Sequence, residues 1–254
     1  MKRLALALAA ALLGGPAALA GPGLLAGQWD VVRVAVDPAD QPHWLYRPGD
    51  PRLLGRTFEV DSSGLRFDDA ECSAPAWKST RSTWRALLAR TYPRPPSPRG
   101  ATFPSPAQMG LGVNATAPIE VLRPRCQAPA GARVFPPFDD GWAVARADGR
   151  LWLRYEEALL TLEPRRADAR PRASFDCHAA ASPAERAICG DFALAAWDRS
   201  VALAFREALA RSGAGASALR AGQHAWLQQR ERCESDKACL ERTQRERVQA
   251  LVQE

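Results

Sequence analysis

Six cysteines and three histidines are the residues of this 254-residue chain that could form covalent bonds, hold a metal or transfer a proton near neutral pH. The cysteines are Cys72, Cys126, Cys177, Cys189, Cys233 and Cys239. An even number is typical of disulfide bonds formed in an oxidising compartment, so we expect three bridges. A zinc site built from cysteines commonly uses CxxC pairs, and the sequence contains none. We therefore expect no metal and no cofactor.

The histidines do not lie in patterns that indicate catalysis. His43 is in a proline-flanked loop, His178 follows a cysteine, and His224 lies beside the inner face of a predicted helix. None of them has a serine or cysteine nucleophile motif around it. The acidic run DDAE at 68–71 follows a predicted strand and is more simply a turn than a catalytic carboxylate pair. The sequence predicts a protein that is not an enzyme.

In the stretch QHAWLQQRERC at 223–233, polar side chains interrupt an otherwise apolar helical stripe. At helical period, and with the preceding leucine included, one stripe carries Leu219, Gln223, Trp226, Arg230 and Cys233. A purely apolar stripe would contain neither the glutamine nor the arginine. These two side chains either face a partner or hold two helices in register.

A helical hairpin centred near Ala214 accounts for the arginine. Residues at equal distance from the turn lie side by side, which places Asp198 level with Arg230 and Phe205 level with Gln223. We therefore expect an Asp198–Arg230 ion pair that fixes the register of the helices. For Gln223 the same structural role is favoured, with partner binding as the alternative.

The same hairpin suggests how the cysteines pair. Cys72 and Cys126 flank an irregular proline-rich region, and a bridge between them would close it onto the sheet. In the helical region we favour bridges from Cys177 and Cys189 to the pair Cys233 and Cys239. Local bridges, in which the first two and the last two of these cysteines pair, stay open as the alternative.

The first 20 residues, MKRLALALAAALLGGPAALA, have the charged start, apolar run and small-residue end of a secretory signal. The apolar run is too short to cross a bilayer, and no later segment is apolar enough to do so. We therefore expect an exported protein, periplasmic or secreted, without a membrane span. The remainder divides into a β-rich domain, residues 21–168, and a helical domain, residues 169–254.

Short alternating segments predict the β-domain. Strands are expected at 29–36, 55–60, 64–68, 119–123, 141–146 and 150–155, with an Asp-Gly hairpin turn at 147–150, a short helix near 80–90 and a proline-rich loop at 93–107. The opening GQW, Gly27 to Trp29, resembles the start of lipocalin-like barrels. We expect an antiparallel barrel-like domain whose core is filled by Trp29, Trp142 and Trp152. A ligand-holding barrel, or a sugar platform using Trp44 and Trp77, is the alternative.

Three helices are expected in the second domain. Ser182 followed by proline and Glu185 is a strong helix start with a capping box, and this helix should run to about Arg211. A second helix spans about 217–233, and a third covers KACLERTQRERVQALV at 237–252. The fold class is thus α+β, with the barrel-like domain followed by a disulfide-bonded antiparallel helical domain.

The net charge of +6 does not indicate nucleic-acid binding. From residue 174 onward eleven basic and eleven acidic side chains cancel, and the excess positive charge of the mature chain is scattered over residues 21–173 among prolines. The preference for arginine over lysine is more simply a property of the coding sequence. We therefore expect a protein partner or a small ligand and no nucleic acid, and the oligomeric state stays open.

The helical domain resembles the LprI-type lysozyme-inhibitor domain family. The matching elements are FDC at 175–177, SPAERAICGD at 182–191, Asp198, QHAWLQQRERC at 223–233, ACL at 238–240, Arg247 and Leu251. The resemblance covers residues 174–254 and implies a small, exported, disulfide-bonded helical domain that binds a lysozyme. Two positions depart from the family pattern: Trp197 replaces a leucine, and Gln244 replaces a tyrosine.

Two functions follow as expectations. The first is a non-catalytic inhibitor that binds a lysozyme or another cell-wall-associated partner, with Glu231, Glu234 and Asp236 of the acidic loop ERCESD, together with Gln223, as candidate contacts. The second is a carrier or sensor whose β-domain binds a small apolar or envelope-derived ligand while the helical domain docks to a partner.

Overall fold

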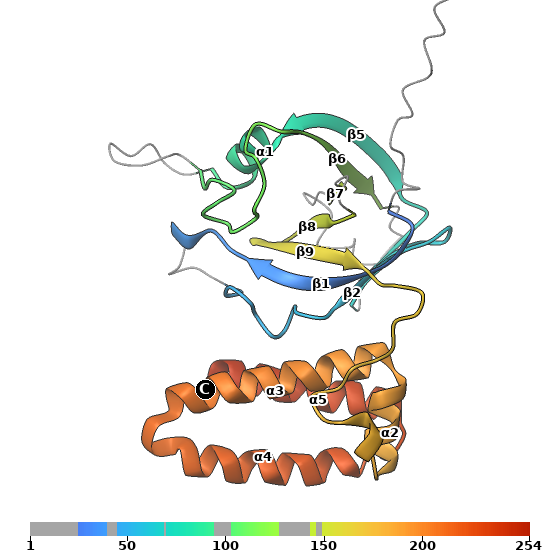
Figure 1. Ribbon diagram of the computed structural model, residues 1–254, viewed down its shortest axis with the longest axis vertical. Coiled ribbons are helices and arrows are strands. Elements are labelled where there is room, and N and C mark those ends of the chain that lie inside the picture. Colours follow the sequence, from blue (N-terminus) through green and yellow to red (C-terminus); the bar gives the residue numbers. More distant parts are fainter. Residues whose placement is uncertain (1–24, 40–44, 69, 94–102, 127–142, 146–148) are drawn as a thin grey trace, which may run out of the picture.

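The computed structural model describes residues 25–39, 45–68, 70–93, 103–126, 143–145 and 149–254. A curled β-sheet lies above a layer of helices, which confirms the α+β class and the order of the two regions (Figure 1). The predicted signal segment, most of the proline-rich loop, His43, Trp44 and Trp142 lie outside the described residues.

Nine strands form one sheet in which every neighbouring pair is antiparallel. They are β1 (Gly27–Ala35), β2 (Thr57–Val60), β3 (Gly64–Phe67), β4 (Ala70–Ser73), β5 (Ala76–Thr83), β6 (Pro118–Arg125), β7 (Ala143–Ala145), β8 (Leu151–Tyr155) and β9 (Ala158–Pro164). Their order across the sheet is β4-β3-β2-β1-β9-β8-β7-β6-β5. The first and last strands pair at the centre, and two consecutive strands form the edges.

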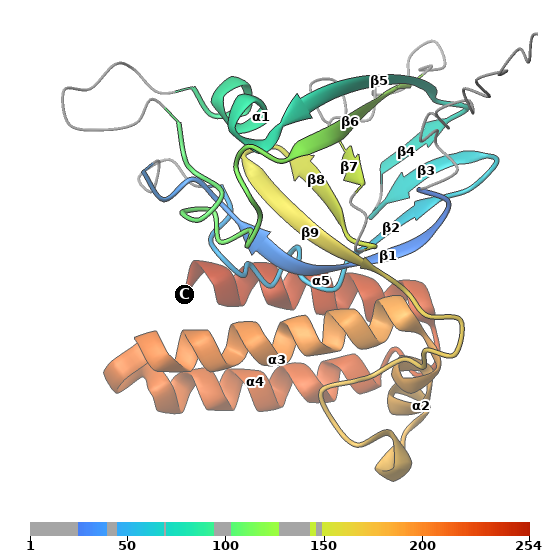
Figure 2. The same cartoon turned by 45° about the horizontal axis from the view of Figure 1, so that its top comes forward.

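The two edge strands are halves of one kinked segment. Because all pairings are antiparallel, β4 and β5 must run in the same direction, and the chain passes between them through Ala74, whose φ is 44°. Cys72 on β4 is bonded to Cys126, which follows β6, with 5.2 Å between the Cα atoms. The kink and this bridge, which was expected, hold the opposite edges of the sheet close together at one end (Figure 2). The sheet is therefore a curled, partly open barrel.

Alternating side chains divide the β-domain into two cores. Leu151 and Leu153 of β8 join a cluster with Trp29, Phe58 and other residues of both halves of the sheet, so the interior of the curl is filled. The indole N–H of Trp29 donates to the carbonyl of Leu25 at 2.8 Å. The filled interior agrees with the expected core at Trp29.

The second core lies on the other face of the sheet, beneath the helix α1 (Trp84–Thr91). Trp152 belongs here and makes an edge contact with Trp84, with 5.3 Å between ring centroids. The expected position of Trp152 beside Trp29 is therefore wrong, because it alternates with the leucines of β8. The helix expected near 80–90 is present as α1, but it begins later, since β5 continues to Thr83, whose side chain accepts a hydrogen bond from the Ala86 backbone N–H.

The helical domain contains four α-helices and not three. They are α2 (Pro183–Gly190), α3 (Phe192–Ser212), α4 (Ala216–Glu231) and α5 (Lys237–Gln253), with short 3-10 turns at Cys177–Ala179 and Gly213–Gly215. The capping box of Ser182 and Glu185 is present. The prediction of one long first helix is wrong, because the helix ends before Asp191. Asp191 accepts hydrogen bonds from the first N–H groups of α3 and so starts a new helix. None of the described helices is long and apolar enough to cross a membrane.

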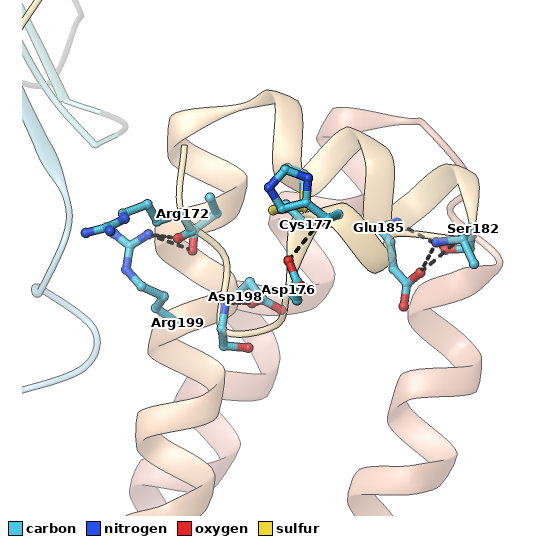
Figure 3. The surroundings of a disulfide bond; sticks show 12 residues. Arg172, Asp176, Cys177, Ser182, Glu185, Asp198 and Arg199 are labelled. Carbon is cyan, nitrogen blue, oxygen red and sulfur yellow. Dashed lines mark hydrogen bonds between the residues drawn. A yellow bond between two sulfur atoms is a disulfide. The ribbon is translucent and has the colours of Figure 1, made fainter. Parts of the chain in front are cut away.

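Both disulfides of the helical domain are local. Cys177 is bonded to Cys189, and Cys233 is bonded to Cys239 across the turn between α4 and α5. The favoured cross-bridges are therefore wrong. They assumed one continuous helix through Cys189, whereas the break at Asp191 makes α2 a separate helix onto which the Cys177 turn folds back (Figure 3).

The Asp198–Arg230 ion pair lies at the centre of the helical domain. The Arg230 guanidinium donates to Asp198 Oδ1 at 3.2 Å. Both residues are buried, with Asp198 4% and Arg230 5% exposed. Asp198 Oδ2 also accepts from the Ser174 backbone N–H at 2.6 Å, and Arg230 donates to Glu231 at 2.9 Å. The pair thus joins α3, α4 and the segment that enters the domain.

Replacing only Arg230 by methionine should destabilise the protein by about 3–5 kcal/mol, because a buried carboxylate loses its counter-ion. The measurement is urea unfolding of the oxidised protein. The double variant Asp198→Leu/Arg230→Met should recover much of the loss, and Arg232→Met, at an exposed site, should be nearly neutral. Equal losses in the single and double variants would contradict a stranded-charge explanation.

Candidate functional site

The contact between the two domains begins with small residues. Helices α3 and α5 lie against the β1–β3 side of the sheet (Figure 2). Gly55, with φ of 74°, meets α3 so closely that an added Cβ would lie 3.2 Å from the Cβ of Ala196. This close approach brings the loop before β2 onto the helix surface.

A buried arginine follows this glycine. The guanidinium carbon of Arg56 lies 3.4 Å from the ring centroid of Trp197 on α3, and its Nη2 donates to Ser200 Oγ at 3.2 Å and to the Leu54 carbonyl at 3.3 Å. Burial lowers the pKa of Arg56 to about 9, so the group keeps its charge at neutral pH. The indole face and the two oxygen acceptors stabilise this charge inside the contact.

Further arginines surround this stack. Arg245 of α5 lies 5.0 Å from the Trp197 centroid and donates to both carboxylate oxygens of Asp68, at 2.9 and 3.0 Å. Arg165, after β9, lies 4.0 Å from the ring centroid of Phe192 at the start of α3. Ion pairs and stacked rings therefore connect the domains on both sides of Arg56.

A cleft of about 560 Å³ opens beside Trp197, between the C-terminal half of α5 and the β-domain. Its lining consists of aromatic, amide and charged side chains with one leucine and one alanine: Tyr46, Arg52, Leu53, Asp68, Tyr155, Trp197, Arg245, Glu246, Gln249, Ala250 and Gln253. Such a concave surface, partly aromatic and with several polar groups, is typical of a small-molecule site.

The aromatic wall is held in place by its own contacts. Tyr46 and Tyr155 lie 5.8 Å apart between ring centroids, and Arg52 lies 4.7 Å from the Tyr46 centroid. Arg52 is paired with the buried Asp50 at 2.8 Å. Burial, and then the neighbouring phenol, raise the pKa of Tyr46, and burial raises that of Tyr155, so both phenols stay protonated at neutral pH. The cleft offers neutral hydroxyls, amides, internally paired arginines and the exposed carboxylate of Glu246.

The residues predicted from the sequence to bind a partner lie away from this cleft. Glu231 accepts from Arg230, and Asp236 caps α5 by accepting from the Cys239 N–H at 3.1 Å. Glu234 is exposed, with φ of 48°, in the disulfide-closed turn. Gln223 accepts from Arg247 Nε at 2.9 Å. Three of these four side chains thus accept hydrogen bonds within the protein, and no such bond is present for the described side chain of Glu234.

His178, in the 3-10 turn Cys177–Ala179, and His224, on α4, are both exposed. Within the described parts of the chain no three His, Cys, Asp or Glu side chains form a group that could hold a metal ion. All six cysteines are bonded to one another, so none is a free metal ligand or nucleophile.

The two departures from the LprI-type pattern have different surroundings. Trp197 packs in the helical core and also presents its ring to Arg56, which a leucine could not do. Gln244 is fully buried, and neither polar atom of its amide has a hydrogen-bond partner among the described residues. The sequence marked Trp197 only as an apolar position, because the arginine that it contacts lies 141 residues earlier.

Gly55→Ala should destabilise the protein more than Gly49→Ala. Both glycines have positive φ, 74° and 68°, so each substitution costs about 1 kcal/mol of backbone strain. Only the Gly55 substitution also meets Ala196, because nothing lies within 4 Å of a Cβ at Gly49. Urea unfolding measures the difference, and equal losses would show that the domains do not approach closely at Gly55.

Comparison of the chain with protein-family models, with curated proteins and with solved structures gives no match. The site therefore has to be interpreted from its own geometry.

Proposed function

We propose that the protein is an exported, non-catalytic binding protein that takes a small ligand into the cleft between its domains. The observation that carries this proposal is a cleft lined both by aromatic residues, the half-buried Tyr46 and Tyr155 and the buried Trp197, and by polar residues of α5. The arginines of the cleft are paired within the protein, Arg245 with Asp68 and Arg52 with Asp50, while the lining residue Glu246 is exposed. Paired charges of this kind orient a ligand without supplying an activated nucleophile or base. Three disulfides support an oxidising compartment as its location.

The chemistry of the cleft favours a saccharide. Sugar rings present C–H groups that pack on aromatic faces, and hydroxyls that bond to planar amide, carboxylate and guanidinium groups. Gln249 and Gln253 are exposed on α5 at the cleft and can exchange hydrogen bonds with such hydroxyls. In the cell envelope a glycan fragment of the cell wall would have this chemistry. This version of the ligand-carrier hypothesis places the ligand outside the filled interior of the sheet.

The test is calorimetric titration of the mature protein with an N-acetylglucosamine tetramer. Gln249→Ala/Gln253→Ala should weaken binding about tenfold, because two hydrogen bonds of about 0.5–1.5 kcal/mol each are lost. The matched control, Gln228→Ala/Gln229→Ala, changes two exposed glutamines of α4 and should bind as the unchanged protein does. Absence of binding by the unchanged protein, or equal weakening by both variants, would contradict the saccharide assignment.

Lysozyme inhibition is the second candidate, and one observation favours it. The turn between α4 and α5 is closed by the Cys233–Cys239 bond and exposes residues 234–238, so it forms a rigid loop at one end of the helical domain. A rigid exposed loop loses little entropy on entering an enzyme cleft. Only Glu234 in this loop has an uncommitted carboxylate to offer, because Asp236 caps α5.

Inhibition is tested by the rate at which lysozyme clears a peptidoglycan suspension in the presence of the mature, oxidised protein. If the loop acts as an inhibitor, Glu234→Lys should raise the inhibition constant, since lysozymes of animal origin are basic and the new charge repels them. Glu71→Lys changes the charge identically at an exposed site on β4 and should leave inhibition intact. If the unchanged protein does not slow clearing, this candidate function is rejected while the cleft proposal stands.

A further inference from the structure

A second groove, of about 600 Å³, lies on the side of the β-domain that faces away from the helices. It is formed by β5, β6 and the end of α1, which lie at the top of Figure 2, together with β8 below them. Its lining residues are Lys78, Thr80, Arg90, Thr91, Pro93, Arg123 and Arg154. Four of these seven side chains are cationic, and none of these described lining residues is acidic.

The groove continues the face of the sheet that α1 covers. Trp152 and Arg154 are two residues apart and therefore lie on the same side of β8, as Val121 and Arg123 do on β6. The tryptophan and the valine pack in the core beneath α1, whereas the two arginines extend beyond it. The backbone of paired strands therefore places the cationic side chains on one surface.

Two of the cations stand directly opposite each other. Lys78 of β5 and Arg123 of β6 are Cα partners in the antiparallel register. Like charges at opposed positions are destabilising in a sheet. Burial, and then the charge of nearby Arg90 on α1, lower the pKa of Arg123.

Two of these cations, Arg123 and Arg90, donate hydrogen bonds to neutral oxygens. Arg123 donates to Thr80 Oγ1 at 3.2 Å, and Arg90 donates to Ser82 Oγ at 3.2 Å. Within the described part of the chain, Lys78, Arg90 and Arg123 form no ion pair with a carboxylate. The protein thus holds together cations that repel one another and leaves their charge available to an anion.

We propose that this groove binds a phosphate group, either free or as part of a phosphate ester. A phosphate dianion has several oxygens and can accept charge-assisted hydrogen bonds from guanidinium and ammonium groups at the same time. A single carboxylate carries less charge and fewer acceptors. Thr80, which also lines the groove, accepts from Arg123 and donates its own proton to the Val121 carbonyl at 3.4 Å, so it holds the guanidinium in place and does not donate to the phosphate.

The first experiment is calorimetric titration of the mature protein with sodium pyrophosphate at low ionic strength, in a phosphate-free buffer. Saturable binding is expected, and Lys78→Gln should weaken it about tenfold because one charge-assisted contact is lost. The matched control is Arg81→Gln, which removes the same charge from the same strand but on the opposite, exposed face. The control should bind as the unchanged protein does.

The second readout is thermal stability. Without phosphate, Lys78→Gln should melt at a slightly higher temperature than the unchanged protein, because the opposed charges are relieved. With pyrophosphate the order should reverse, since only the unchanged groove is stabilised by ligand. A variant that merely misfolds would melt lower in both conditions.

The source of the phosphate is resolved by co-sedimentation with vesicles of phosphatidylglycerol or of phosphatidylcholine alone. Sedimentation with phosphatidylglycerol that Lys78→Gln abolishes and Arg81→Gln retains would assign a lipid headgroup. Soluble binding without sedimentation would assign a free phosphate ester. Binding to neither pyrophosphate nor vesicles, or equal losses in both variants, would overturn the proposal.

Discussion

The stacked contact between Arg56 and Trp197 is the constraint on which the arrangement of the two domains depends. A guanidinium that is almost fully buried needs compensation for its lost water, and here the indole face at 3.4 Å, Ser200 and a backbone carbonyl supply it. Separation of the domains would remove two of these three partners. The sheet and the helices therefore form one unit, and the cleft beside Trp197 exists because they do.

This arrangement separates two surfaces with different electrostatics. In the cleft the arginines are paired with carboxylates, so the surface is polar and close to neutral. On the far side of the sheet four cations line one groove, and two of them, Arg90 and Arg123, donate to hydroxyl groups. The net charge of +6, which looks scattered along the chain, is concentrated there in part because β5 and β6 pair residues about 45 positions apart.

Local signals in the sequence predicted the elements whose cause is local. The Ser182–Glu185 capping box and the third helix follow from residues within a few positions, and the structure contains both. The Asp198–Arg230 contact required only that two helices be antiparallel. The strand β9 was not predicted because its run ALLTLEP lacks clear alternation, being buried on both faces of the sheet.

The cleft could not be predicted, because its parts come from four distant segments. Tyr46 lies in a loop organised by Asp50, Tyr155 ends β8, Trp197 is on α3, and the glutamines are on α5. Likewise, the split of the first helix depended on Asp191 acting as a cap, although the continuous apolar seam predicted one helix. The cleft arises from three-dimensional contacts that composition and period do not encode, whereas the break at Asp191 is a local capping signal that the apolar pattern outweighed.

The most direct test of the account is differential scanning calorimetry of the mature, oxidised protein. If the two domains unfold as one unit, we expect a single transition whose calorimetric and van't Hoff enthalpies agree. Two resolved transitions, one for the β-domain and one for the helical domain, would show that the Arg56–Trp197 contact does not couple them. The cleft would then have no fixed geometry, and the central claim would be contradicted.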